Sequence, residues 1–303
     1  MVLKRTNSIL AVIGLIASLC LADVAFTQNK STSESYQQAI KDYDKAIGLN
    51  PRDAEPYNNR GIVYTKLGNY QQAIKDFNKA IKLNPNYAMA YNNRGLAYAT
   101  LGNHQQAIKD FDKAIELNPK DAEAYNNRGL AYNDLGNQQK AIRDYNKAIE
   151  LNPNLSEAYY NRGIAYGKLE KYQQAINDYN RTIELNPNLP EAYYNRGIAY
   201  GKLEKYQQAI KDFSKAIELN SKDSEAYYNR GFTYGKLEKY QQAIKDYNKA
   251  IKLNPKDAEL YYFRGLVYVI LGNKIRSIQD FKISAQLGGK DAQKRLSDEG
   301  LSW

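Results

Sequence analysis

Cysteine and histidine are almost absent from this sequence. Its 303 residues include one cysteine, Cys20, and one histidine, His104. A single cysteine excludes an intramolecular disulfide, and the shortage of both residue types excludes the common zinc sites and cysteine-dependent catalysis. The sequence also lacks a glycine-rich phosphate loop and a nucleophile paired with a base. We therefore expect a protein without catalytic residues, cofactor or metal ion.

Long hydrophobic runs are also absent, except at the N-terminus. Lys4 and Arg5 precede an apolar run from Ile9 to Ala22. This run is shorter than the roughly 20 residues that a membrane-spanning helix needs. The basic start and the short apolar run make residues 1–22 typical of a secretory signal peptide. We therefore expect an exported protein, located in the periplasm, at the cell surface or in the medium.

Residues 1–22 could be cleaved, lipidated or retained. Cys20 and Ala22 are small residues that favour a cut after Ala22, and a cut after Ala25 is the second choice. Cys20 could instead carry a lipid, although Leu19 stands where a small residue is expected, or the segment could remain as a membrane anchor. A membrane contact is expected only if the segment is not cleaved. A cut after Ala22 leaves a chain without cysteine, which suits an oxidising compartment.

Negative charge is scarcer than positive charge, and tyrosine is abundant. The sequence has 33 acidic residues, 43 lysines and arginines, a net charge of +10, and 28 tyrosines. This balance favours acidic partners or anionic surfaces, without implying nucleic acid.

One unit of 34 residues repeats along most of the chain. The string that starts at Tyr57, with Arg60 and Gly61 in it, returns in altered form at Tyr91, Tyr125, Tyr159, Tyr193, Tyr227 and Tyr261. Positions in a repeat are called places, with Ala54 at place 1. Repeats of this length stack into a solenoid. Seven full repeats follow, preceded by a half repeat over residues 36–53; they span 54–87, 88–121, 122–155, 156–189, 190–223, 224–257 and 258–291.

Each repeat is expected to form two helices, A and B. In the first repeat, helix A is predicted over Glu55–Leu67 and helix B from about Tyr70 to Leu83, because Gly68 marks a turn. The proline after Asn84 ends helix B.

Shorter elements are expected at both ends of the array, which covers residues 31–287. Residues 23–30 are predicted to be a polar linker, and the S-x-x-E string at Ser31 indicates a helix start. The half repeat supplies a lone helix B. Residues 288–303 are predicted to hold a capping helix, Asp291 to Asp298, and a tail.

Two residue types recur where helices are expected to meet. Glycine stands at place 8 inside every helix A, at a cost of about 1 kcal/mol relative to alanine. This cost predicts a close approach of helix B, with Ala73 or Ala107 as the approaching residue. Arginine at place 7 and aspartate at place 23 recur together, which predicts a bridge, bidentate if the geometry allows. The alternative is an arginine ladder for an anionic ligand.

The repeat resembles the tetratricopeptide repeat (TPR). The resemblance rests on an aromatic residue at place 4, glycine at 8, tyrosine at 11, alanine at 20 and 27, phenylalanine or tyrosine at 24, and proline at 32. It covers residues 36–287, with arginine instead of the family's usual leucine at place 7. It implies an all-α fold, a right-handed superhelical solenoid of helix-turn-helix repeats. Helix A would line the concave face, with places 2, 5, 6, 9, 12 and 13 pointing inward.

Candidate binding residues occupy three of these places. Place 6 carries asparagine, place 5 changes from asparagine to tyrosine in the fourth repeat, and place 13 carries several lysines. The candidates are Asn59, Asn93, Asn127, Asn161, Asn195, Asn229, Tyr160, Tyr194, Tyr228, Lys168, Lys202 and Lys236. A carboxamide can bond both N–H and C=O of an extended backbone, tyrosine adds rigid contact area, and lysine attracts acidic groups. The alternative is that these polar residues only keep an exposed helix face soluble.

The leading hypothesis is a non-catalytic scaffold that binds an extended polypeptide segment of another protein, with an acidic segment as one option. A solenoid that binds RNA or another anionic polymer is the alternative, with nucleic acid less favoured. Self-association in a structural role is a third option, and the sequence does not define the oligomeric state. The family's clamp for chaperone tails needs lysine at place 5 and basic residues at places 2 and 6. Here place 2 is glutamate in six of seven repeats, and place 5 has no lysine.

Overall fold

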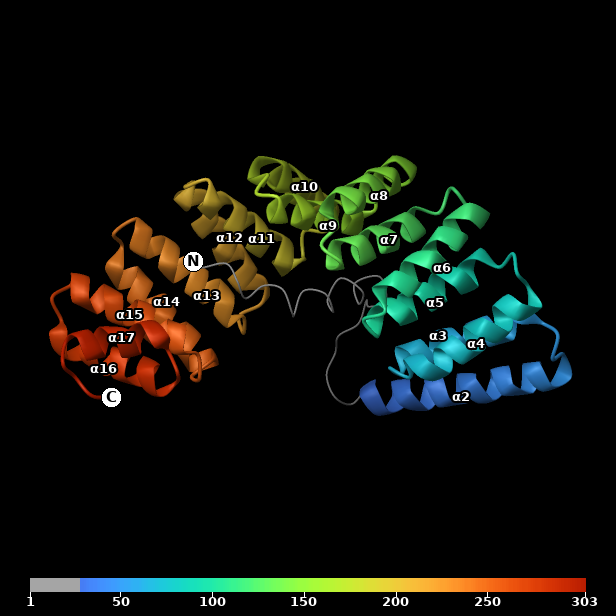
Figure 1. The fold of residues 1–303 in the computed structure, drawn as a ribbon, viewed down its shortest axis with the longest axis horizontal. Helices are drawn as coiled ribbons and strands as arrows, with labels where there is room; N and C mark the ends of the chain where they lie inside the picture. The colour runs from blue at the N-terminus through green and yellow to red at the C-terminus, as the bar shows by residue number, and fades with distance from the viewer. Residues whose placement is uncertain (1–27) are drawn as a thin grey trace. The chain divides into compact units, whose positions relative to one another are not determined.

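The computed structural model describes the backbone of residues 28–303 and the side chains from Glu34 onward. The predicted signal peptide therefore lies outside the described residues. Within them, every regular element is an α-helix, and none is long and apolar enough to cross a membrane. The helices are α2 Gln28–Leu49, α3 Ala54–Lys66, α4 Tyr70–Leu83, α5 Ala88–Thr100, α6 His104–Leu117, α7 Ala122–Asp134, α8 Gln138–Leu151, α9 Ser156–Lys168, α10 Tyr172–Leu185, α11 Pro190–Lys202, α12 Tyr206–Leu219, α13 Ser224–Lys236, α14 Tyr240–Leu253, α15 Ala258–Ile270, α16 Lys274–Gln286 and α17 Lys290–Asp298 (Figure 1).

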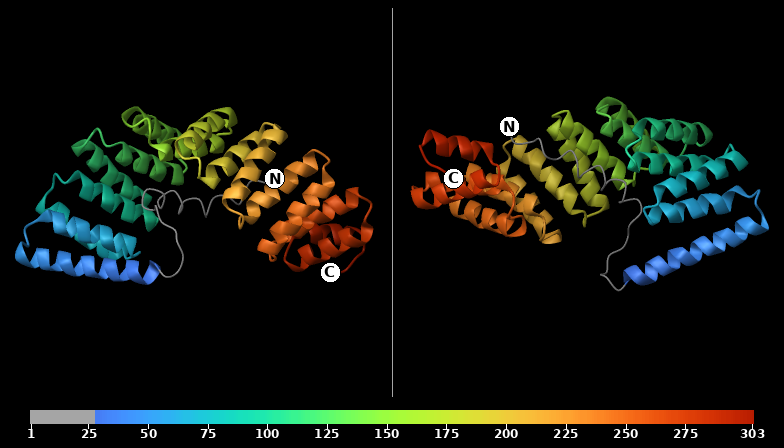
Figure 2. Two further views of the ribbon diagram at one scale, coloured as in Figure 1. Left: turned by 180° about the vertical axis from the view of Figure 1, so that it is seen from behind. Right: turned by 60° about the horizontal axis from the view of Figure 1, so that its bottom comes forward.

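The described residues form two compact bodies, one that ends at Leu169 and one over Glu170–Trp303, and their boundary falls in the turn of the fourth repeat. Helices α2 to α9 belong to the N-terminal body and α10 to α17 to the C-terminal body. In each body every helix packs against the next one along the chain. Helix A of one repeat also contacts helix A of the next, so that α3, α5, α7 and α9 form one row and α11, α13 and α15 another (Figure 1, Figure 2). The array is thus an all-α repeat solenoid, as the sequence predicts.

The first described helix differs from the prediction. Helix α2 begins at Gln28, so the last residues of the predicted linker, 23–30, are helical. Ser31 therefore lies inside the helix and not at its N-cap. Four of the seven A helices, α3, α7, α13 and α15, have an aspartate N-cap: Asp121 accepts hydrogen bonds from the backbone N–H groups of Glu123 and Ala124 at 3.0 and 3.1 Å.

The glycine at place 8 makes room for an aromatic ring of helix B. A Cβ atom built on Gly61 would lie 2.6 Å from Phe77 Cε1, and one on Gly95 would lie 2.7 Å from Phe111 Cε1. The close approach was predicted correctly, but the nearest atoms to Gly61 and Gly95 belong to the aromatic ring and not to the expected Ala73 or Ala107. The alanine at that place approaches in two other repeats, where Ala141 O and Ala243 O would lie 3.2 Å from a Cβ on Gly129 and Gly231. Helices A and B meet through the place 24 ring, which is fully or almost fully buried.

The arginine at place 7 makes the predicted bridge within its own repeat. Arg94 Nε and Nη2 donate to the two carboxylate oxygens of Asp110 at 2.7 and 2.6 Å, in bidentate geometry. Both side chains are largely buried, the carboxylate more than the guanidinium. The same pair occurs in every repeat that lies within one body, at Arg60, Arg94, Arg128, Arg196, Arg230 and Arg264.

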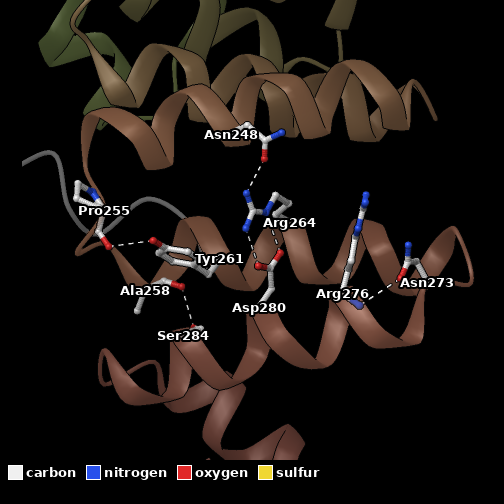
Figure 3. Close-up of polar contacts among 9 residues, drawn as sticks. All are labelled: Asn248, Pro255, Ala258, Tyr261, Arg264, Asn273, Arg276, Asp280 and Ser284. Atoms are coloured by element: carbon white, nitrogen blue, oxygen red, sulfur yellow. Dashed lines mark hydrogen bonds and ion pairs between the residues drawn. The ribbon is translucent and has the colours of Figure 1, made fainter.

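The same arginine also reaches the preceding repeat. Arg94 Nη1 donates to Asn78 Oδ1 at 2.6 Å, which belongs to the previous helix B. In Figure 3, Arg264 lies between Asp280 of its own repeat and Asn248 of the preceding one. Each guanidinium further lies over the tyrosine ring at place 4, as Arg94 does over Tyr91 at 5.5 Å. One side chain therefore joins three helices.

Three turns contain a glutamate in a conformation that favours glycine. Between helices A and B, Glu170, Glu204 and Glu238 have φ angles of +58° to +59°, where four other repeats have glycine at the same place. A left-handed residue other than glycine costs about 1–2 kcal/mol. These turns therefore keep glutamate at a cost in stability.

We predict that removing Arg128 breaks a buried pair. Arg128→Ala leaves Asp144 buried without its cation, which should lower the free energy of unfolding by about 3 kcal/mol. Lys147→Ala, which removes an exposed pair with Glu150, is the control and should have little effect. Urea unfolding followed by circular dichroism measures both. Equal, small effects of the two variants would refute the structural role of the arginine.

We also predict that glycine at the strained turns stabilises the C-terminal body. Glu204→Gly and Glu238→Gly should each raise the free energy of unfolding by about 0.5–1 kcal/mol, because relief of strain exceeds the added chain entropy of glycine. The reverse change, Gly136→Glu at a φ of +78°, should destabilise the N-terminal body. Thermal unfolding of the variants tests this, and a lower melting temperature for Glu204→Gly would contradict it.

Candidate functional site

The predicted binding residues lie along the rows of A helices, but they differ in exposure. Lys168, Lys202 and Lys236 are exposed at the C-terminal ends of α9, α11 and α13. Half-buried candidates are Asn59, Asn93, Asn127, Tyr194, Asn195 and Asn229. Buried candidates are Tyr160, Asn161 and Tyr228.

The asparagines form a hydrogen-bonded row between repeats of the N-terminal body. Asn93 Nδ2 donates to Asn58 Oδ1 at 3.1 Å, which links place 6 of one repeat to place 5 of the preceding one. The same bond joins Asn127 to Asn92 at 3.2 Å and Asn161 to Asn126 at 3.1 Å. The ladder is therefore built into the contacts between A helices. A carboxamide that gives one bond in this way retains a second N–H for a ligand where it is exposed.

Place 5 is buried in four of the seven repeats, at Asn58, Asn92, Tyr160 and Tyr228, and half-buried in the other three. Asn58 is fully buried and Asn92 nearly so. Tyrosine at this place is buried too: Tyr228 packs its ring against Tyr247 and Phe263, with centroids 6.1 and 5.5 Å apart. Place 5 lies where successive A helices contact one another, so its side chains fill that contact.

Tyr160, Tyr228 and Asn161 therefore offer little surface to a ligand, and their part in a binding groove stays a prediction. Tyr160 is 8%, Tyr228 6% and Asn161 3% exposed. Burial also raises the pKa of Tyr228 above its ordinary value, because the phenolate would lose its hydration.

In the C-terminal body, Tyr194 takes over the role of the place 5 asparagines. Asn229 Nδ2 donates to the Tyr194 hydroxyl at 3.0 Å and to the Glu225 carbonyl at 2.9 Å. In the next repeat Phe263 replaces asparagine at place 6, and the buried Tyr228 hydroxyl has no hydrogen-bond partner. The missing bond follows from this single replacement, since phenylalanine has no donor.

The three lysines have different surroundings. Lys168 Nζ donates to the Asn133 side-chain oxygen at 3.2 Å, and desolvation lowers the pKa of Lys168 while Asp134 opposes this change. Lys236 Nζ lies 5.4 Å from the Phe232 ring centroid. Lys202 is exposed at the end of α11. Within the described residues, Lys202 and Lys236 are thus the two candidate lysines for which no hydrogen bond to a neighbouring side chain competes with an acidic ligand, and both are exposed in the C-terminal body.

Sequence reasoning missed the polar residue at place 25 of helix B, which receives the arginine of the next repeat. Its signal is the recurrence of a short polar side chain at one place, 16 residues before each arginine. The residues that receive the arginine are Asp44, Asn78, Asp112, Asn146, Asn180, Ser214 and Asn248.

No group of three histidine, cysteine, aspartate or glutamate residues able to hold a metal ion occurs in the described part of the chain. His104 lies with Nδ1 3.9 Å from Asp134 Oδ2.

A matched pair of variants tests the hydrogen-bonded row. Tyr194→Phe removes the acceptor of Asn229 and should lower the free energy of unfolding by about 1 kcal/mol. Tyr228→Phe removes a buried hydroxyl without a partner, and should leave stability unchanged or raise it by up to about 1 kcal/mol. Equilibrium unfolding in urea compares the two. A larger loss for Tyr228→Phe than for Tyr194→Phe would refute the assignment.

Comparison with known proteins places these repeats in a family. A tetratricopeptide-repeat model matches six segments, and a further TPR-repeat model matches residues 33–68; the seventh repeat lies beyond the matched residues, which together run from 33 to 257. The six segments are 54–87, 88–121, 122–155, 156–189, 190–223 and 224–257.

Individual proteins resemble parts of the chain. It is 54% identical over 35 residues to the Hsp70-Hsp90 organizing protein of Triticum aestivum, a stretch that spans 12% of this chain and only 6% of that protein. A tetratricopeptide repeat protein from Parabacteroides merdae has a similar structure, with a TM-score of 0.58 and 26% identity over 80% of this chain and 96% of the other. YrrB, described as a TPR protein with an unusual peptide-binding site, aligns with a TM-score of 0.50 and 26% identity over 61% of this chain and 95% of its own.

The matched models cover more than half of the sequence, and the fold agrees with them. The chain therefore belongs to the tetratricopeptide-repeat family, whose members generally bind other proteins.

Proposed function

We propose that the protein is a non-catalytic scaffold that binds an extended polypeptide segment of another protein on its A helices. The observation that carries this proposal is the fixed spacing of these helices. Arginines join each repeat to the preceding one, and place 6 asparagines join adjacent A helices. A surface with a regular, preorganised pattern suits a ligand that is itself regular, such as an extended backbone, because little ordering is left for binding.

The composition of the A helix surface favours a peptide with apolar and acidic residues. Place 9 carries a half-buried aliphatic or aromatic residue in every repeat except the third, where Leu130 is buried. In the C-terminal body, Lys202 and Lys236 are exposed at one end of the helices, beside Ile198 and Phe232 at place 9. An apolar centre with cations along one edge can bind apolar side chains and attract carboxylates at the same time.

The tyrosines argue against nucleic acid as the partner, although the net charge is +10. Base stacking needs exposed aromatic faces. All seven place 4 rings have an arginine over them at 5.5 to 5.7 Å, and Tyr160 and Tyr228 at place 5 are buried. These tyrosines stabilise the repeats and offer no stacking platform.

The short match to the Hsp70-Hsp90 organizing protein raises the question of a chaperone tail as ligand. Lysine at place 5 would be buried between A helices in this chain, where Asn58 and Asn92 lie. Place 2 holds glutamate in every repeat except the second, which has Met89. The surface thus has a different charge pattern from a carboxylate clamp, and we propose a different peptide partner.

Two double variants with equal loss of charge test the location of the binding surface. Lys202→Thr with Lys236→Thr alters place 13, and threonine stands there in the second repeat at Thr100. Lys211→Asn with Lys245→Asn alters exposed places on the B helices, and asparagine stands there in the fourth repeat at Asn177. Each residue introduced is one that the fold already accepts at that place.

We expect the first variant to bind the partner about tenfold more weakly, because two charge contacts are lost, and the second to bind like the unchanged protein. The partner is first captured from a nuclease-treated extract, identified and cut to its binding segment. Calorimetry with that segment then gives the dissociation constants. Equal affinity of both variants would refute binding on the A helices, and a captured nucleic acid whose affinity falls steeply with salt would replace the proposal.

A further inference from the structure

The turn between α15 and α16 exposes a cluster of aliphatic side chains in the C-terminal body. Val269 is 40%, Ile270 60%, Leu271 40% and Ile275 74% exposed. The four residues lie within seven positions of the sequence, at the end of one helix, in the turn and at the start of the next. They form the densest group of exposed large aliphatic residues along the described sequence. Solvated aliphatic groups of this kind mark contact sites.

Other repeats show that the fold does not need this cluster. The second repeat has Ala99, Thr100 and Gln105 at the places of Val269, Ile270 and Ile275; the sixth has glycine, lysine and glutamine. Both fold into the same helix pair. The aliphatic residues of the seventh repeat therefore serve something other than the core of the solenoid.

The charges around the cluster are positive. Lys274 and Arg276 bracket Ile275, and both are exposed. No acidic residue occurs between Leu266 and Gln279. The turn of the preceding repeat carries two further cations, Lys236 and Lys239, and one acidic residue, Glu238. The cluster thus combines aliphatic side chains at a turn with a surplus of cations beside them.

We propose that the α15–α16 turn docks on an anionic lipid surface. Aliphatic side chains would enter the boundary between headgroups and acyl chains, while Lys274 and Arg276 contact the phosphates. This contact centres on the turn of the seventh repeat, next to the A-helix edge proposed above for peptide binding, which includes Lys236. Vesicle binding is measured without any peptide, so the two proposals are tested separately.

Two observations favour lipid over a protein surface. The cluster has no tryptophan or tyrosine among its exposed residues, whereas protein interfaces depend on aromatic anchors, with leucine and valine under-represented. A second copy of this chain on the same patch would bring Lys274 and Arg276 of both copies together, and like charges oppose that contact.

The test uses the whole protein and a variant with the residues of the second repeat, Val269→Ala, Ile270→Thr and Ile275→Gln. This variant keeps the net charge and should fold, which circular dichroism verifies. Flotation with phosphatidylcholine vesicles, with and without about 30% phosphatidylglycerol, gives the binding. We expect the unchanged protein to bind the anionic vesicles and the variant to bind at least about tenfold more weakly. A second variant, Lys274→Gln with Arg276→Gln, should lose the preference for anionic lipid.

Hydrogen exchange locates the contact, and it separates binding by the turn from any binding by the N-terminal segment. Anionic vesicles should slow exchange over residues 266–279 and leave the turns of the N-terminal body unchanged. Absence of this protection, or equal vesicle binding by the unchanged protein and the aliphatic variant, would overturn the proposal. Light scattering that shows a dimer lost in the aliphatic variant would also overturn it, in favour of self-association.

Discussion

The ion pair between place 7 and place 23 is the constraint on which the rest of the structure depends. A buried aspartate such as Asp110 is unfavourable without a cation, and the bidentate guanidinium of Arg94 satisfies both of its oxygens. Since the guanidinium has five donors in a fixed plane, its remaining nitrogen reaches the preceding helix B at Asn78. Leucine, the family's usual residue at this place, would pack against its neighbours but could not join helices by directional hydrogen bonds. Here the angle between consecutive repeats is set by hydrogen bonds as well as by shape.

The second row of hydrogen bonds follows from the first. Once arginine fixes neighbouring repeats, places 5 and 6 of adjacent A helices meet at a constant distance, and one residue must donate to the other. Asparagine on asparagine satisfies this requirement in the N-terminal body, and asparagine on tyrosine satisfies it at Asn229. The seventh repeat departs from the pattern: Phe263 packs edge-on against Tyr228 at 5.5 Å, and the row ends there. The same repeat carries the aliphatic turn, so two deviations from the pattern of the other repeats occur in the seventh.

Most of the fold could be predicted from the sequence because seven copies of the same pattern support one assignment of the helices. The period of 34 residues fixed the helix boundaries to within a residue at Ala54–Lys66 and Tyr70–Leu83. The recurrence of arginine and aspartate predicted their bridge. The exposure of single places was harder to predict. A helical wheel shows that places 5 and 9 share a face, but it does not show how closely the next helix A approaches, and this approach buries Asn58 and leaves Ile62 half-exposed. For the same reason the spacing predicts Ala73 as the neighbour of Gly61, where the structure has the Phe77 ring. The spacing of residues along a helix does not show how far a long side chain extends.

Within this chain, the places that vary between repeats are the ones that a partner can distinguish. Arginine, glycine and aspartate recur at places 7, 8 and 23 without change, and all three are occupied by contacts inside the solenoid. Place 13, at the exposed end of helix A, has Lys66, Thr100, Asp134 and Ile270 in different repeats. This place varies although its neighbours at places 7 and 8 do not, and its side chains range from the exposed Ile270 to Asp134 beside His104. An array of equal repeats would bind a ligand in any register, whereas unequal charges and aliphatic groups along its edge favour one register by opposing the others. The stabilising contacts therefore hold the repeats in place, and under the proposed function the variable edge would be the part that selects one register of the ligand.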